Sequence, residues 1–71
     1  PFRIAEVIIE DGVMIGEHAT VLLGVTIGRN SWIGANSVVT TSIPPYAIAA
    51  GIPAKVIRRR DPATGKWERA L

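Results

Sequence analysis

The stretch Ile9–Ile43, IEDGVMIGEHATVLLGVTIGRNSWIGANSVVTTSI, decides the fold of this chain. A branched aliphatic residue occupies every sixth position of it, and the full set is Ile9, Ile15, Val21, Ile27, Ile33 and Val39. An α-helix repeats at about 3.6 residues and a strand at about two, so neither produces this spacing. We interpret the pattern as a hexapeptide repeat, which is typical of a parallel β-helix.

Each repeat is expected to hold one short strand and one turn, with the aliphatic side chain pointing inward. Three repeats would then close one triangular turn of about eighteen residues. Residues 9–26 and 27–44 would form two such turns, with parallel strand pairing between them. This stacking puts each aliphatic residue beneath the one eighteen positions later, giving the pairs Ile9 and Ile27, Ile15 and Ile33, and Val21 and Val39.

A second set of positions supports the same arrangement. Four residues after each aliphatic residue stands a mostly small or apolar one that should also face inward: Val13, Ala19, Val25, Ser31, Ser37 and Ile43. The expected strands lie near 7–9, 13–15, 20–22, 25–27, 31–33 and 37–40. The alternative, a pair of ordinary β-hairpins, would leave the regular spacing to accident.

Glycine and asparagine mark the turns between these strands. Gly16, Gly28 and Gly34 each follow an aliphatic residue directly, where the chain must bend or another backbone must come close. Asn30 and Asn36 fall in the turns, where asparagine tolerates the left-handed backbone conformation. We therefore expect tight corners at these positions.

The regular pattern ends at the two prolines of 44–45, because proline cannot donate to a strand ladder. A further short strand is expected over 46–48. The segment 55–58, Lys-Val-Ile-Arg, predicts an extended strand with both cations on one side. At the end of the chain, 66–71 is expected to form a helical turn or to fray, with Trp67 as its anchor.

With 71 residues the chain can hold one domain at most, and two turns of β-helix bury little surface. We therefore expect further turns upstream, oligomerisation, or both. The chain divides into a lead-in (1–6), the repeat region with the segment that follows it (7–58), and a basic tail (59–71). It has no cysteine and no long apolar run, so we expect no disulfide and no membrane partner. The expected location is cytoplasmic.

Charge is distributed unevenly along the chain. Residues 1–54 carry a net charge of −2 and residues 55–71 a net charge of +4. The basic end favours an anionic partner, such as a phosphate-bearing ligand, or a solvated tail. A nucleic-acid or acidic-surface binder using Arg58-Arg59-Arg60 is the weaker interpretation, because only Trp67 is close enough for stacking and no known motif is present. Nucleic acid is not an expected partner.

Three segments carry a resemblance to a known family: IGANSVVT at 33–40, IPPY at 43–46 and AGIPAKVIR at 50–58. Together they closely resemble the C-terminal end of the hexapeptide-repeat acyltransferases, in the branch of galactoside, maltose, xenobiotic and polysaccharide O-acetyltransferases. The resemblance covers roughly 7–58. It implies a left-handed parallel β-helix, a homotrimer, and acetyl-CoA as acyl donor bound between neighbouring subunits. The acceptor would be a hydroxyl or amine of a small molecule or carbohydrate.

The resemblance also implies a cofactor site. Ala35 and Thr40 match positions whose backbone contacts the pantetheine and adenine parts of CoA, and Thr41 stands where some relatives carry a lysine. Lys55 and Arg58 match cations that reach the CoA phosphates. This chemistry is consistent, because phosphate oxygens favour charge-assisted donors.

The catalytic base of the family is a histidine that lies upstream of the segment present here. His18 is the one histidine of this chain and so the one candidate base, although a turn residue at the surface or between subunits is the competing interpretation. A non-catalytic trimeric scaffold that lacks the base is therefore the alternative function. A single histidine does not supply the three-histidine metal set of the β-helix carbonic anhydrases, and the family's acetyl transfer needs no metal.

Overall fold

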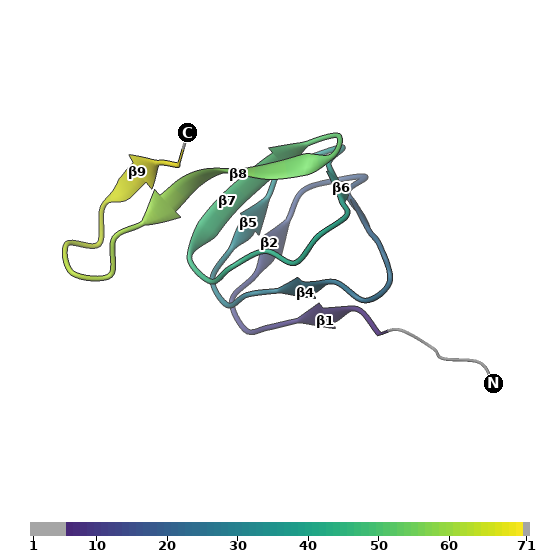
Figure 1. Ribbon diagram of the computed structural model, residues 1–71, viewed down its shortest axis with the longest axis horizontal. Helices are drawn as coiled ribbons and strands as arrows, with labels where there is room; N and C mark the ends of the chain where they lie inside the picture. Colours follow the sequence, from purple (N-terminus) through teal and green to yellow (C-terminus); the bar gives the residue numbers. More distant parts are fainter. Residues whose placement is uncertain (1–5, 71) are drawn as a thin grey trace.

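The computed structural model describes residues 6–70, which form strands, turns and extended links (Figure 1). Within this range the prediction of an all-β chain is confirmed. The strands, in chain order, are β1 (Ile8–Ile9), β2 (Met14–Ile15), β3 (Thr20–Val21), β4 (Thr26–Ile27), β5 (Trp32–Ile33), β6 (Val38–Val39), β7 (Ala47–Gly51), β8 (Ala54–Arg60) and β9 (Trp67–Arg69).

The first six strands pair in parallel across three separate sheets, β1 with β4, β2 with β5 and β3 with β6. In each pair the offset along the chain is 18 residues, as the repeat predicts. The partners are Ile9 and Ile27, Ile15 and Ile33, and Val21 and Val39. The predicted stacking of one level of chain on the next is therefore confirmed for these residues.

The second level, which runs from Ile27 to the residue before Ile43, is shorter than the sequence suggested. Ile43 bridges to Ile27, and Ala49 pairs with Ile33, so the offset falls to 16 residues. The prediction that 27–44 forms one complete turn is wrong, because Ile43 takes the place of a repeat aliphatic only four positions after Val39. The shortened corner closes on β4, where the Ile43 amide donates to the carbonyl of Thr26 at 2.9 Å.

The aliphatic residues of the repeat are buried at one end of the stack and exposed at the other. Ile9 and Ile15 of the first level keep 48% and 41% of their surface exposed, whereas Ile27 and Ile33 above them keep 0% and 3%. The upper end is closed by small residues of the β7–β8 hairpin that pack on the core: Ala47, Ala49 and Ala54. The core therefore sits between the second level and this hairpin.

Two serines lie in the core, and both satisfy the backbone of the level above them. The Ser31 hydroxyl donates to the carbonyl of Pro44 at 2.6 Å and accepts from the amide of Ala47 at 3.3 Å. Ser37 Oγ accepts from the amide of Gly51 at 3.1 Å. A buried hydroxyl without such partners would be costly, so the serines fit because the third level leaves backbone groups to be satisfied.

Left-handed backbone conformations recur at the corners with the period of the repeat. Five of these residues follow one another at intervals of six: Gly12, His18, Gly24, Asn30 and Asn36. The next, Tyr46, lies in the third level, after the shortened one. The predicted left-handed geometry of Asn30 and Asn36 is confirmed. The predicted close backbone approach is confirmed at Gly16, where an added Cβ would lie 2.5 Å from the backbone nitrogen of Ala35.

The end of the chain leaves the stack and forms a second hairpin. Strand β8 runs antiparallel to β7, continues past the edge of the levels, and pairs antiparallel with β9 (Figure 1). The prediction of a helical turn or a frayed end over 66–71 is wrong for 67–69, which form β9; Leu71 lies outside the described residues. Trp67 does anchor this segment, because its ring packs against Trp32. Across 6–70 the chain forms no helix able to cross a membrane.

Candidate functional site

Lys55 and Arg58 lie on one face of the sheet, although they are three residues apart in a strand. Lys55 pairs with Ala50, and Arg58 pairs with Ile48, so both cations oppose residues on the same side of β7. The register shifts between these pairs, which leaves Ile57 as an extra residue on β8. Strict alternation would have placed the two cations on opposite faces. The prediction of one side is confirmed, and the bulge is its cause.

This outer face also carries a row of apolar and cationic side chains. Met14 pairs with Trp32, Trp32 with Ile48, Ile48 with Arg58, and Arg58 with Arg69, across all strands of the five-stranded sheet. Met14 and Trp32 keep 58% and 48% of their surface exposed. The inner face of β7 is buried by comparison, so the row combines accessible apolar surface with positive charge.

Ala35 lies at the corner beside the start of this face. It is exposed in the turn between β5 and β6, and the turn rests on Gly16 of the level below. The residue before it, Gly34, lies close to Ala50, the partner of Lys55, because a Cβ added at Gly34 would be 3.0 Å from the Ala50 Cβ. The structure thus brings Ala35 and Lys55 to the same end of the β7–β8 hairpin.

Thr40 and Thr41 lie at the next corner and are both exposed. They follow β6, whereas Ala35 precedes it, so the length of that strand separates the two sets of candidate residues. Strand β6 lies against β8, which carries the two candidate cations. The five candidate cofactor-binding residues therefore surround β6 and β8 without converging on a single pocket.

His18 occupies the same corner as Ala35, one level lower. It has a φ of 59°, and Asn36 directly above it has the same value. The two levels are joined there by the Asn36 amide, which donates to the carbonyl of Glu17 at 2.9 Å. The corner therefore requires a residue that accepts the left-handed conformation at position 18, and His18 fills that structural role. Among residues 6–70 no three side chains of the metal-binding types are grouped closely enough to hold an ion.

A cluster that sequence reasoning missed lies at the third corner, around Tyr46. The guanidinium carbons of Arg29 and Arg60 lie 5.5 Å and 5.8 Å from the centre of its ring. Hydrogen bonding from the Arg29 side chain, and next from Asn30, lowers the pKa of the Tyr46 phenol below 10.0. The available signal was an aromatic residue just after two prolines at the end of the repeat.

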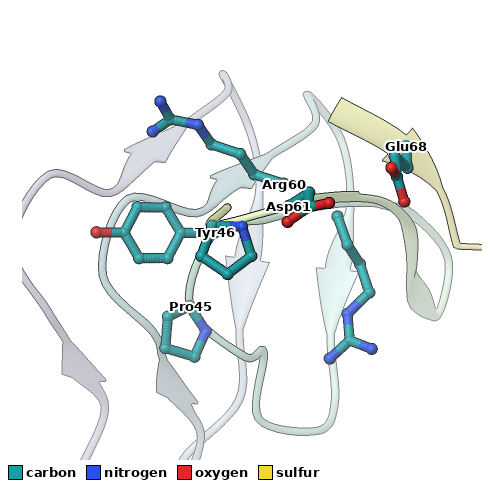
Figure 2. A pocket seen from close by; sticks show the side chains of 7 residues that line it. Pro45, Tyr46, Arg60, Asp61 and Glu68 are labelled. Atoms are coloured by element: carbon teal, nitrogen blue, oxygen red, sulfur yellow. The ribbon is translucent and has the colours of Figure 1, made fainter. Parts of the chain in front are cut away.

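Two cavities adjoin this ring. One of about 290 Å³ is lined by Arg29, Tyr46, Arg60 and Pro62. The other, of about 370 Å³, shares three of these residues and extends under the β8–β9 hairpin, where it is also lined by Asp61 and Glu68. Figure 2 shows the Tyr46 ring and the Arg60 guanidinium extending to the same side, away from Glu68.

Comparison with known proteins identifies the family. Residues 6–41 match the family described as the hexapeptide repeat of succinyl-transferase. The chain belongs to this hexapeptide-repeat family. Galactoside O-acetyltransferase of Escherichia coli (strain K12) is 56% identical to this hexapeptide-repeat chain over 50 residues, which is 70% of the chain and 25% of the relative. The resemblance drawn from the sequence, including its O-acetyltransferase branch, is therefore confirmed.

Solved structures agree with the match. A hexapeptide-repeat acetyltransferase of Vibrio cholerae, complexed with acetyl-CoA, superposes with a TM-score of 0.76 at 42% identity over 78% of this chain and 30% of that one. A maltose O-acetyltransferase of Clostridium difficile gives a TM-score of 0.78 at 46% identity over 80% and 30%. The hexapeptide-repeat chain spans 33% of a putative lipopolysaccharide biosynthesis O-acetyl transferase of Escherichia coli (strain K12) and 25% of the galactoside O-acetyltransferase.

Proposed function

We propose that this chain is the acetyl-CoA-binding end of an acetyltransferase that acts on a hydroxyl or amine of a small molecule or carbohydrate. The observation that carries the proposal is the position of Lys55 and Arg58 on one outer face, beside the apolar row of exposed Met14 and Trp32 and half-buried Ile48. Relatives named for galactoside and maltose as acceptors favour a carbohydrate hydroxyl.

The chemistry of this face suits the two ends of CoA. Phosphate oxygens favour charge-assisted hydrogen bonds, which the ammonium of Lys55 offers as a point charge and the guanidinium of Arg58 as a planar fork. The apolar row provides a surface for the pantetheine arm. In this proposal Ala35, Thr40 and Thr41 contribute backbone contacts at the corners on either side of β6.

The proposal includes the fold and the assembly. We infer that the three levels are coils of a left-handed parallel β-helix, supported by the 18-residue parallel offset and by the solved neighbours. We infer a homotrimer with acetyl-CoA held between neighbouring subunits. Exposed apolar side chains at two corners, Leu23 and Ile52, support association of this kind. Sedimentation equilibrium tests it, and a monomer that binds CoA would overturn the shared site.

Transfer itself requires a base. The acceptor oxygen or nitrogen attacks the thioester carbonyl while the base takes its proton. The carbon–sulfur bond then breaks, and the protonated base gives the proton to the sulfur, so that CoA leaves as the thiol. We propose that His18 holds the corner beneath Asn36 and does not take the proton. His18→Asn should then leave melting temperature and CoA affinity unchanged, because asparagine also tolerates a φ near 59°.

Calorimetric titration with CoA tests the cofactor site. The Lys55→Ala/Arg58→Ala variant should bind CoA at least roughly 100-fold more weakly, since hydrogen bonds to charged groups contribute about 1.5–3 kcal/mol each and about 1.4 kcal/mol is tenfold in affinity. Arg59→Ala is the matched control: Arg59 is the next residue on β8, but it opposes Ala47 and so belongs to the other face. Arg59→Ala should bind CoA nearly as well as the unaltered chain.

Either of two results would contradict the proposal. Unchanged CoA affinity in a folded Lys55→Ala/Arg58→Ala variant would remove these cations from the site. A folded, trimeric chain that does not bind CoA at all would favour a scaffold role over a cofactor-binding one.

A further inference from the structure

Arg29 and Arg60 reach Tyr46 from two different parts of the chain. Arg29 lies at the corner after β4, and Arg60 is the last residue of β8. The backbone joins them, because the Tyr46 amide donates to the carbonyl of Arg29 and the Arg60 amide donates to the carbonyl of Tyr46, both at 2.9 Å. Two like charges are thus fixed beside one ring by the main chain.

Tyr46 adopts a conformation that its residue type disfavours. Its φ is 55°, in the left-handed region, where a bulky residue is an outlier and costs roughly 1–2 kcal/mol. The equivalent corner positions earlier in the repeat hold glycine, asparagine or histidine. Strain of this kind is often found at functional sites. An aromatic ring at this corner therefore calls for a role that a glycine or an asparagine would not fill.

The smaller cavity beside Tyr46 is lined by two guanidinium groups, a phenol and a proline, and by no carboxylate. Asp61 lines only the adjoining cavity, and its carboxylate oxygen accepts from the amide of Ala63 at 2.8 Å. Glu68 opposes Arg59 across the β8–β9 pair. Glu10 is also nearby, since its Oε1 accepts from the backbone amide of Arg29 at 3.0 Å, but it does not line this cavity. The lining therefore carries two positive charges and no negative one.

We propose that Arg29, Tyr46 and Arg60 form a second anion-binding site, which takes the phosphate monoester of a ligand other than CoA. Such a group carries close to two negative charges above neutral pH, which matches two guanidinium groups. Each guanidinium can bind phosphate oxygens in a planar, bidentate manner, and the phenol adds a hydroxyl donor. In Arg60 the two terminal nitrogens would do so, because its Nε donates to the carbonyl of Gly65 at 3.2 Å. A cavity of about 290 Å³ has room for the phosphate and part of the molecule that carries it.

The site is separate from the cations proposed for CoA. Lys55 and Arg60 lie near opposite ends of β8, on the order of 16 Å apart at about 3.3 Å per residue. Arg58 lies only two residues before Arg60, but it lines neither of the two cavities beside Tyr46. Lys55 adjoins the corner of Ala35, whereas Arg60 adjoins the corner of Tyr46. The inference rests on the proposed function in one respect only: the proposed function assigns CoA to the other site, so CoA is not the ligand of this one.

The phenol of Tyr46 supplies the readout, because it is the only tyrosine of the chain. Its titration is followed by ultraviolet absorbance of the phenolate, in inorganic phosphate and in chloride of equal ionic strength. Bound phosphate adds negative charge beside the phenol, so phosphate should raise the pKa of Tyr46 while chloride should not. The Arg29→Gln/Arg60→Gln variant should lose this effect. Lys55→Gln/Arg58→Gln, which removes the same charge from the other site, should keep it.

The source of the phosphate is tested in the same titration. A hexose 6-phosphate should reproduce the effect of inorganic phosphate, and saturating CoA should not. The proposal is overturned if phosphate leaves the phenol unchanged, or if the effect survives in a folded Arg29→Gln/Arg60→Gln variant. It is also overturned if CoA raises the pKa of Tyr46 and 3′-dephospho-CoA does not, since the cluster would then belong to the cofactor site. A chain that fails to bind CoA would contradict the proposed function and leave this test intact.

Discussion

Trp32 and Trp67 pack with their ring centroids 6.4 Å apart and their planes tilted by 49°. Trp32 belongs to the second level of the repeat and Trp67 to the last strand, so this contact holds the terminal hairpin against the stack. Aromatic pairs prefer such tilted arrangements and contribute roughly 0.5–1.5 kcal/mol beyond their buried area. The contact explains why the end of the chain forms a strand.

Trp67→Ala should release β9 from the stack. Loss of the aromatic contact lowers the free energy of local opening, so amide hydrogen exchange in β9 should become roughly tenfold faster. Exchange in β5 should change little. Trp67→Phe is the control, because it keeps a ring at the contact. Unchanged exchange in β9 of the alanine variant would show that the ring pair does not hold the hairpin.

Ile9 and Ile27 are both isoleucines, occupy equivalent positions of the repeat and pair with each other, but their burial differs. Ile27→Ala should lower the free energy of unfolding by about 2–5 kcal/mol, because its side chain is fully buried. Ile9→Ala should cost much less, because about half of that side chain is already exposed. Denaturant unfolding of both variants measures the difference. Equal losses would contradict the burial gradient along the stack.

Gly28 lies against the backbone of Pro44 and Pro45, and an added Cβ would collide with both residues. Gly28→Ala should therefore destabilise the chain by about 1–3 kcal/mol, as overpacking typically does. Gly34→Ala is the matched comparison, since its nearest neighbours would be the side chains of Ala50 and Ser37 at 3.0 Å and 3.4 Å. A lower melting temperature for Gly34→Ala than for Gly28→Ala would overturn this order.

The lowered pKa of Tyr46 makes stability depend on pH in the alkaline range. The folded chain loses the phenol proton at a lower pH than the unfolded chain, whose value is near 10.0. The contribution of Tyr46 is therefore absent at neutral pH, grows as the pH rises through the folded pKa, and is complete above 10.0. Denaturant unfolding of the unaltered chain and of Tyr46→Phe, at neutral pH and near pH 10.0, isolates this contribution. A difference between the two that is independent of pH would contradict it.

The repeat itself could be predicted from the sequence because its signal is local and redundant. Each aliphatic residue from Ile9 to Ile33 is supported by a small or apolar inward residue and by a left-handed corner residue at fixed spacing, so one period accounts for strands, stacking and corners together. The close approach of another backbone at Gly16 followed from the position of glycine in the same repeat, but the sequence did not identify Ala35 as the neighbour. The candidate cations on β8 were recognised from their resemblance to a known motif.

The parts that escaped prediction depend on contacts between distant segments. Ile43 satisfies the spacing of a small inward residue and also replaces a repeat aliphatic, and only its pairing with Ile27 decides between the two. The extra residue at Ile57 is visible only once β7 and β8 are in register. The cluster around Tyr46 joins a corner of the repeat to the end of β8, so no local pattern marks it.

The antiparallel hairpin at the upper end of the stack has a consequence for self-association. Parallel strands stacked at a constant offset form an open edge on which a further molecule could add, as in fibrous assemblies. In the five-stranded sheet that edge is occupied, because β8 covers β7 and reverses the strand direction. The outermost strand, β9, carries Glu68 and Arg69, and charged residues of this kind discourage edge-to-edge pairing. The β7–β8 hairpin and strand β9 therefore disfavour the addition of a further molecule to this edge of the sheet.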